Sequence, residues 1–221
     1  TTVPGPDGVR HLTVEIIEEA AQAQRVTYDK SGDNHYDVVS AFIKSMRGSD
    51  PDAALYWFAR MIYANEDPRF IVRRIIVHAS EDVGMADPNA MLMAHAAANA
   101  LEWVGMPEAR IPIAQAIIYI ATAPKSNSVV TATDEALHTV ASTSSEPVPV
   151  HLRDAHYKGA SRLGHGVGYK YPHDYPHHYV NQQYMPANLS DVKFYKPSDQ
   201  GREKLIRERL EWFAKFGAGR K

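Results

Sequence analysis

Histidines and an aspartate crowd one glycine- and proline-rich stretch of the chain and are candidates for metal chemistry. They are His165, His173, Asp174, His177 and His178. Two histidines four residues apart on a helix can bind one metal ion, and His173 and His177 have that spacing. Pro172 and Pro176 argue against a helix there, because proline breaks a helix interior. We therefore favour hydrogen-bonding loop histidines, assign no metal ligand, and keep a metal-dependent hydrolase as an alternative.

Nucleophilic and nucleotide-binding chemistry have weaker support in the same region. Ser161, His165 and Asp174 could form a nucleophile triad, yet neither a nucleophile elbow nor an oxyanion loop accompanies them. Residues 164–168 hold three glycines but lack the G-x-G-x-x-G spacing and follow no predicted strand. No G-x-x-x-x-G-K-[S/T] phosphate loop occurs in the chain. We therefore assign no catalytic or cofactor-binding residue to this segment.

Charge is distributed unevenly, and the basic part is where an anionic partner would bind. Residues 1–150 hold 11 Lys/Arg against 19 Asp/Glu, whereas residues 151–221 hold 13 against 7. The basic third also holds seven tyrosines, whose rings can stack on bases while cationic side chains bind phosphates. The predicted DNA contacts are Lys158, Arg162, Lys170, Arg202, Lys204, Arg207 and Arg209. The opposing interpretation is that the last four pair with Glu203, Glu208 and Glu211 along one helix.

Composition narrows the class of protein. The 221 residues include no cysteine, which excludes disulfides and thiolate metal sites, and 44% are hydrophobic, enough for one good core. No run of about 18 apolar residues and no signal sequence occur, so neither a membrane span nor secretion is predicted. We expect a cytoplasmic protein, associated with the nucleoid where it binds DNA. Because the chain starts with Thr1 and not with Met, we expect either a piece of a longer protein or a complete chain that has lost its Met.

Two helices near the start of the chain organise the predicted fold. Apolar residues from Val38 to Met46 recur on one helical face, and Gly48 follows where a left-handed C-terminal cap is expected. Asp50 and Pro51 then suit the N-cap and first position of a second helix. The buried stripe of that helix is predicted to be Leu55, Phe58, Met61 and Ile62. Two such helices joined by a short turn pack as an antiparallel hairpin.

Further helices follow, so the predicted fold class is an all-α multi-helix bundle. Asp-Pro pairs at Asp67 and Asp87 open helices over 69–81 and 89–104. The helix over 107–123 is apolar nearly all round and must be covered on most sides. Its predicted inward residues are Ile111, Ala114, Ile117, Ile118 and Ala121.

The C-terminal third is predicted to be less regular. Helices are expected over 126–141, 153–163 and 199–216, with an extended segment over 147–152. A Gly/Pro/Tyr-rich loop over 164–198 separates the last two helices, and its tyrosines predict an ordered path. The apolar side of the last helix is predicted to be Leu205, Ile206, Leu210 and Phe213.

Short motifs spread along the chain resemble one protein family. They include Arg47-Gly48-Ser49-Asp50-Pro51, Ser80-Glu81-Asp82-Val83-Gly84, Ala123-Pro124-Lys125-Ser126-Asn127, Pro149-Val150-His151-Leu152-Arg153, Gly168-Tyr169-Lys170-Tyr171 and Gln182-Gln183-Tyr184-Met185-Pro186. Their types and order resemble the C-terminal region of replication-associated recombination protein A. This family, RarA or MgsA, consists of AAA+ ATPases related to clamp loaders, and the eukaryotic Werner-helicase-interacting ATPase is similar. The departures are local, chiefly at residues 131–145 and 177–178.

The resemblance implies a clamp-loader-like helical collar with two regions. Residues 1–28 would be the end of the AAA+ lid and a linker, and residues 29–221 a helical C-terminal oligomerisation domain whose part 151–221 is basic and Tyr-rich. By resemblance the domain forms a homotetramer, in an ATPase that serves replication-fork maintenance, recombination and repair. ATP and Mg²⁺ are implied for an ATPase module outside this segment. DNA, single-stranded or forked, and replication proteins are the implied partners.

Two alternatives stay open beside this interpretation. The first is a stand-alone nucleic-acid-binding helical module that uses the basic third. The second is the metal-dependent hydrolase built on the histidine loop. The molecular mass in solution and the metal content after purification would distinguish them.

We expect no ATP hydrolysis by this polypeptide, because it has no phosphate loop to hold the nucleotide. The measurement is phosphate release by the purified chain, beside a mock purification. Turnover above that control, abolished by a point mutation in this chain, would contradict the expectation.

Overall fold

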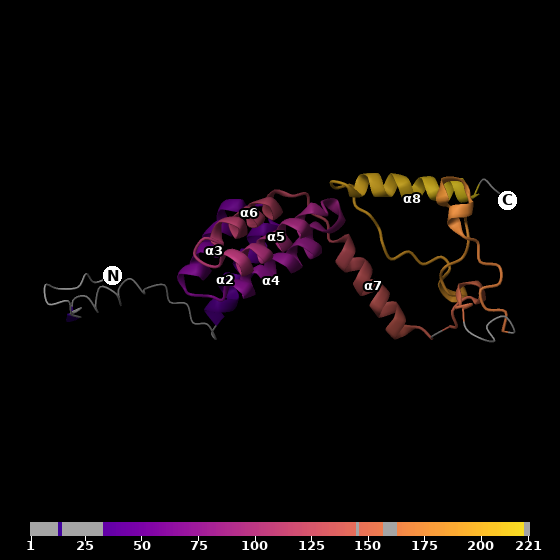
Figure 1. The fold of residues 1–221 in the computed structure, drawn as a ribbon, viewed down its shortest axis with the longest axis horizontal. Helices are drawn as coiled ribbons and strands as arrows, with labels where there is room; N and C mark the ends of the chain where they lie inside the picture. Colours follow the sequence, from indigo (N-terminus) through magenta and orange to yellow (C-terminus); the bar gives the residue numbers. More distant parts are fainter. Residues whose placement is uncertain (1–12, 15–32, 145, 157–162, 219–221) are drawn as a thin grey trace. The chain divides into compact units, whose positions relative to one another are not determined.

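The computed structural model describes residues 13–14, 33–144, 146–156 and 163–218, and within them every regular element is helical (Figure 1). The all-α class is confirmed. The chain divides into two units. The first unit holds α2 (Asp33–Arg47), α3 (Pro51–Tyr63), α4 (Pro68–His78), most of α5 (Asn89–Val104) and α6 (Arg110–Thr122). The second unit holds residues 79–91, α7 (Ser128–Ser142), the Tyr-rich loop and α8 (Glu203–Ala218).

The predicted hairpin of α2 and α3 is confirmed, with one correction at its turn. The left-handed residue is Ser49, with φ 62°, and not Gly48. Ser49 and Asp50 donate their N–H groups back to the carbonyls of Met46 and Ser45, which closes the end of α2. Asp50 then caps α3, because its carboxylate accepts the N–H of Ala53 at 2.9 Å.

The other two Asp-Pro pairs cap helices in the same way. Asp67 accepts the N–H of Arg69 at 2.9 Å, and Asp87 accepts that of Asn89 at 3.0 Å. α5 has the predicted bounds. α4 is shorter than predicted, since it ends at His78 and continues as a π-helical turn over Ala79–Val83.

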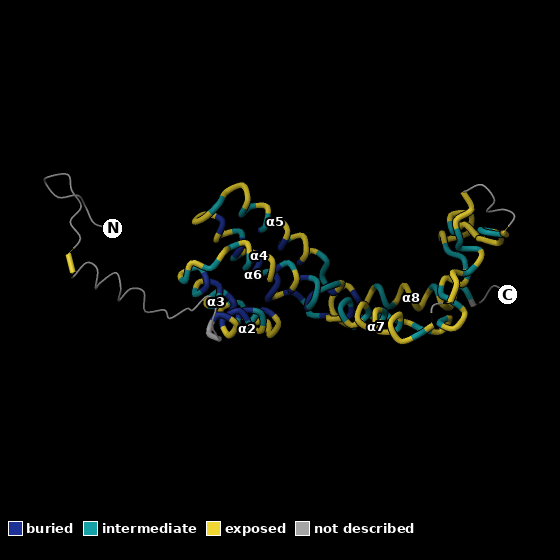
Figure 2. Tube along the Cα trace, turned by 90° about the horizontal axis from the view of Figure 1, so that it is seen from below, coloured by how far each residue is buried: buried dark blue, intermediate teal, exposed yellow. Residues whose placement is uncertain are grey.

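The core of the first unit is apolar and fully enclosed. Phe42, Met46, Ile71 and Ile75 have no exposed surface, and Met61 is 1% exposed. Figure 2 shows buried residues gathered in α2 to α6, while α7 and α8 carry mostly intermediate and exposed ones. The hydrophobic effect therefore holds the first unit together.

The predicted inward face of α6 is confirmed at Ile117 and Ala121 and wrong at Ile111 and Ile118. The helix starts at Arg110, after a turn, and its buried residues are Ile113, Ala116, Ile117, Ile120 and Ala121. Ile111 and Ile118, predicted inward, are 66% and 42% exposed. A helix that is apolar all round has no amphipathic face, so its sequence does not say which side meets the core.

The second unit departs from the sequence prediction at three points. Residues 150–152 form a short 3-10 helix where an extended segment was predicted, and residues 153–156 are not helical. The rest of the expected 153–163 helix lies largely outside the described residues. α8 begins at Glu203, four residues later than predicted, and Leu205 on its predicted apolar side is 63% exposed. No helix in the described part of the chain is long and apolar enough to cross a membrane.

Replacing Phe42 by alanine should lower the free energy of unfolding by about 3–5 kcal/mol, because it leaves a cavity in an enclosed core. Urea denaturation of the purified chain measures the change. Tyr56→Ala is the matched control, since that aromatic side chain is 60% exposed and its loss should cost less than about 1 kcal/mol. Equal costs at both positions would mean that the hairpin is not packed as described.

Candidate functional site

The first candidate surface is an apolar groove between α3 and α6 in the first unit. It has a volume of about 690 Å³. Its apolar lining consists of Leu55, Phe58, Ala59, Ile111, Ala114 and Ile118. Arg110 and Gln115 also border it, and Arg110 donates a hydrogen bond to the Pro107 carbonyl oxygen at 3.2 Å. The exposed isoleucines of α6 thus belong to a concave surface suited to an apolar partner.

The second unit is anchored by a buried carboxylate at the first residue of α8. Glu203 has no exposed surface. Its oxygens accept hydrogen bonds from the hydroxyls of Ser126 and Ser198, both at 2.6 Å, and from that of Ser128. The Ser198 N–H and the Tyr195 hydroxyl, both at 2.9 Å, complete the set. We call these five residues the Glu203 cluster.

The donors of the Glu203 cluster favour the ionised carboxylate. Burial alone would raise the pKa of Glu203, but the hydrogen bonds from Ser126, Ser128 and Ser198 outweigh it and lower the pKa to about 2. Burial and the hydrogen bond to Glu203 raise the pKa of Tyr195 to about 12. Glu203 therefore carries a full negative charge at neutral pH, and Tyr195 stays a hydrogen-bond donor.

Backbone contacts around the cluster bring three segments of the second unit together. Arg202 donates its N–H to the Ala86 carbonyl oxygen at 2.7 Å, directly before α8 begins. Gly201 precedes it with φ 49°, and a Cβ there would lie 2.2 Å from the same oxygen. Only glycine fits this approach. Ser126 in turn donates its N–H to the Asp82 carbonyl oxygen at 2.8 Å.

The Asp82 carboxylate interacts electrostatically with the Lys125 ammonium group. Burial lowers the pKa of Lys125, and the Asp82 carboxylate opposes that shift. The Lys125 ammonium also donates to the Ala123 carbonyl oxygen at 2.7 Å. The positive charge is thus held beside the π-helical turn over Ala79–Val83.

A second hollow lies where the Tyr-rich loop meets the last turn of α8. Its volume is about 210 Å³. The side chains that give it chemical character are Lys170, Tyr175, Tyr179, Asn181 and Phe216. We call it the aromatic pocket. The loop is held on α8 by ring stacking, with Tyr179 on Phe213 at a centroid distance of 4.5 Å. The prediction of an ordered loop is confirmed for the described residues.

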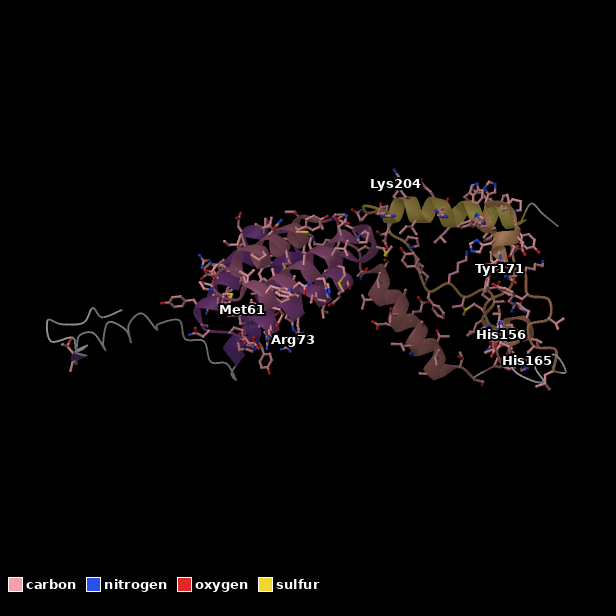
Figure 3. The ribbon with its side chains drawn as sticks, viewed as in Figure 1. Met61, Arg73, His156, His165, Tyr171 and Lys204 are labelled. Atoms are coloured by element: carbon pink, nitrogen blue, oxygen red, sulfur yellow. The ribbon has the colours of Figure 1, made fainter. Side chains whose placement is uncertain are left out.

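The structure separates the predicted DNA contacts. Lys158 and Arg162 lie outside the described residues. Lys170 lines the aromatic pocket, next to the end of α8. The remaining four are Arg202, Lys204, Arg207 and Arg209. They lie in or just before the first half of that helix, and Figure 3 labels Lys204 at its start. Arg209 lies over the Phe213 ring, 5.4 Å from its centroid.

The opposing interpretation, in which Glu203 is a surface partner of these basic side chains, was wrong for this residue. It accepts hydroxyl and backbone N–H groups instead. Two sequence features could have pointed to the buried Glu203: a glutamate at the start of a helix and the polar run 126–128. Both are common on protein surfaces, so neither indicates burial. Gln182, which holds Lys170 in place, was missed as well.

His173 and His177, whose spacing suggested a metal pair, contact different rings. Pro172 and Pro176 each open a separate 3-10 turn, where the sequence predicted only that no α-helix forms, and His177 has φ 61°. The His177 ring meets Trp212 edge-on at 5.1 Å, whereas His173 contacts His178 at 4.9 Å. Among the described residues, no three His, Asp or Glu side chains are grouped to hold a metal ion. Ser161, the candidate nucleophile of the triad with His165 and Asp174, lies outside the described residues.

Comparison with known proteins places the helical fold in a family. Residues 48–214 match the family model described as MgsA AAA+ ATPase C terminal, and residues 1–47 match that of the AAA C-terminal domain. Replication-associated recombination protein A of Bacillus subtilis is 48% identical over 202 residues, covering 91% of this chain and 48% of that protein. Its Escherichia coli K12 namesake is 45% identical over 208 residues, covering 94% and 46%. ATPase WRNIP1 of Dictyostelium discoideum is 39% identical over 186 residues, covering 84% and 21%.

An all-helical chain with these matches is a C-terminal region of the AAA+ ATPase class. Within that class, the chain belongs to the family of replication-associated recombination protein A, also called RarA or MgsA. The resemblance inferred from the motifs is confirmed. The chain spans about half the length of these bacterial relatives. The two family models meet between residues 47 and 48, and the division after residue 28 stays a prediction.

Replacing Glu203 by glutamine should lower the free energy of unfolding of the second unit at pH 7 by roughly 3 kcal/mol. The folded pKa lies below the usual 4.5, so the carboxylate adds stability above about pH 4.5. That contribution is lost as the pH falls toward about 2. Urea unfolding at pH 7 and pH 3 measures it, followed by tryptophan fluorescence in a chain whose Trp57 and Trp103 are replaced by phenylalanine, so that Trp212 alone reports on the second unit. Glu208→Gln, exposed on the same helix, is the control, and a pH-independent Glu203→Gln effect would contradict the assignment.

Proposed function

We propose that this chain is the self-association module of a RarA-like AAA+ ATPase, and that it assembles as a homotetramer. The observation that carries the proposal is the apolar groove of α3 and α6, which leaves two isoleucines of a core helix exposed. Exposed concave apolar surface of this kind marks interaction sites. A second copy of the chain is the occupant, since the family resemblance implies a tetramer.

Two exposed apolar side chains on α5 are the alternative contact: Leu92 is 66% exposed and Trp103 is 87% exposed. These residues are eleven positions apart, about 16 Å along the helix, so they do not form a continuous patch by themselves. Ala96 and Asn99 lie between them on the same face. The groove offers six apolar side chains around one hollow. We therefore assign the subunit contact to the groove.

The activity of the whole protein is proposed by analogy with its relatives. The E. coli and B. subtilis proteins are named for replication-associated recombination, and the D. discoideum relative is named an ATPase. We infer that ATP and Mg²⁺ bind a module outside residues 1–221, and that the assembled ATPase acts on DNA at replication forks, in recombination and repair. We propose that the whole protein is cytoplasmic and associates with DNA there.

Replacing Ile111 by glutamate should convert the tetramer to monomers, because association would bury an unpaired charge in an apolar groove. Light scattering measures the mass, which should fall from four times 24.6 kDa to a single chain. Ile111 is 66% exposed, so the monomer should stay folded by circular dichroism.

Leu92→Glu is the matched control, since that side chain is also 66% exposed but lies on α5. It should leave the mass unchanged. Dissociation by Leu92→Glu alone would move the interface to α5. A wild-type monomer across micromolar concentrations would refute self-association of this segment.

A further inference from the structure

The aromatic pocket combines ring walls, an amide and an ammonium group in one hollow. Tyr175, Tyr179 and Phe216 supply the rings, Asn181 the amide and Lys170 the ammonium. Planar aromatic ligands stack on such rings, amides hydrogen-bond to base edges, and a lysine binds phosphate. We propose that the aromatic pocket binds an unpaired base of a single-stranded nucleic acid, with Lys170 on the adjoining phosphate. This inference deepens the DNA-binding part of the proposed function and rests on it.

The walls of the pocket are held in place before any ligand arrives. Tyr179 stacks on Phe213 with 25° between the rings, and Phe216 stacks on Trp212 at 4.9 Å with 15°. A Cβ on Gly217 would lie 3.1 Å from the Tyr179 hydroxyl, so the last turn of α8 lies close against the loop. Because these rings are already ordered, a ligand that stacks on them loses little binding free energy to the ordering of side chains.

Lys170 is positioned by its backbone, which leaves its ammonium group available. Its N–H donates to the Gln182 side-chain oxygen at 3.2 Å, and the Gln182 amide donates back to the Lys170 carbonyl oxygen at 2.8 Å. In the described part of the chain, no carboxylate lies within salt-bridge distance of the Lys170 ammonium. The side chain is exposed beside the pocket.

A neighbouring hollow extends the site in one direction. It has a volume of about 530 Å³ and is lined by Asn181, Gln182, Gln183, Tyr184 and Met185, among others. Asn181 borders both hollows. The Gln182 amide also donates to the Tyr184 hydroxyl at 2.8 Å, which orients a ring that is 53% exposed. Tyr171, beside Lys170, is 53% exposed as well. Two adjoining hollows with exposed rings suit successive nucleotides better than one free nucleotide.

The partner must be single-stranded, because a base enters such a pocket only when it is not stacked in a duplex. An anionic strand also matches the charge of residues 151–221, with 13 Lys/Arg against 7 Asp/Glu. The basic residues of the first half of α8 are not needed for this site. Lys204 and Phe216 are twelve residues apart, about 18 Å along the helix, and Figure 3 shows Lys204 at its start.

The test is binding of a fluorescent oligothymidylate to the whole chain, measured by anisotropy over a range of salt. We expect Tyr175→Ala and Lys170→Ala each to weaken binding about tenfold or more, with Tyr175→Phe close to wild type because the ring is kept. Lys170→Ala should also reduce the salt slope by about 0.7, the value for one lost phosphate contact on a single strand. Lys44→Ala is the matched control, since it removes the same charge from an exposed lysine of α2 that is not a predicted DNA contact.

Several outcomes would overturn the inference. The first is no binding by the wild type at low salt, and the second is an equal loss for Lys170→Ala and Lys44→Ala. The others are unchanged binding by Tyr175→Ala and equally tight binding of a duplex or of thymidine monophosphate. Light scattering of the same samples reports self-association separately. A tetramer that does not bind the strand would refute this site alone, whereas a strand-binding monomer would refute the self-association proposal alone.

Discussion

The second unit depends on one buried carboxylate. Among the described residues of α7 and α8, the buried ones are Ser128 and Glu203, and these two are hydrogen-bonded to each other. A carboxylate removed from water is costly unless donors surround it, and here hydroxyls and a backbone N–H do so. Because hydrogen bonds are directional, the cluster sets where α8 starts. The position of α8 in turn sets where its aromatic last turn meets the loop.

The two units are therefore stabilised by different physics. The first has an enclosed apolar core, in which Phe42, Ile71 and Ile75 have no exposed surface. The second has few buried apolar side chains in its long helices and relies on the Glu203 cluster and on ring stacking. Acid should weaken the second unit through Glu203, whereas apolar burial carries no such pH dependence.

The groove and the aromatic pocket both consist of side chains that the fold of their unit leaves exposed. α6 is apolar all round, so the side that does not meet the core must meet solvent or another molecule, and it forms the groove with α3. In the second unit, the rings that hold the loop on α8 also wall a pocket beside Lys170. Assembly and nucleic-acid contact are thus proposed for separate surfaces of one module.

Much of the fold was determined locally by the sequence. The three Asp-Pro caps, the bounds of α5, the α2–α3 hairpin and the interruption of any α-helix at Pro172 and Pro176 all depend on residues close together in the chain. The family resemblance depended on the same kind of short motif. These features were predicted because capping and proline restriction act within a few residues.

The tertiary structure decided what depends on distant residues. Glu203 meets Ser126 and Ser128 across more than seventy positions, so nothing near it in the sequence marked it as buried. The sequence did not show that Ile111 faces away from the core, because α6 is apolar nearly all round. The grouping of Lys170 with Tyr175 and Phe216 likewise required the loop to fold back on α8. Sequence patterns report local preference, whereas burial and site geometry are set by which segments meet.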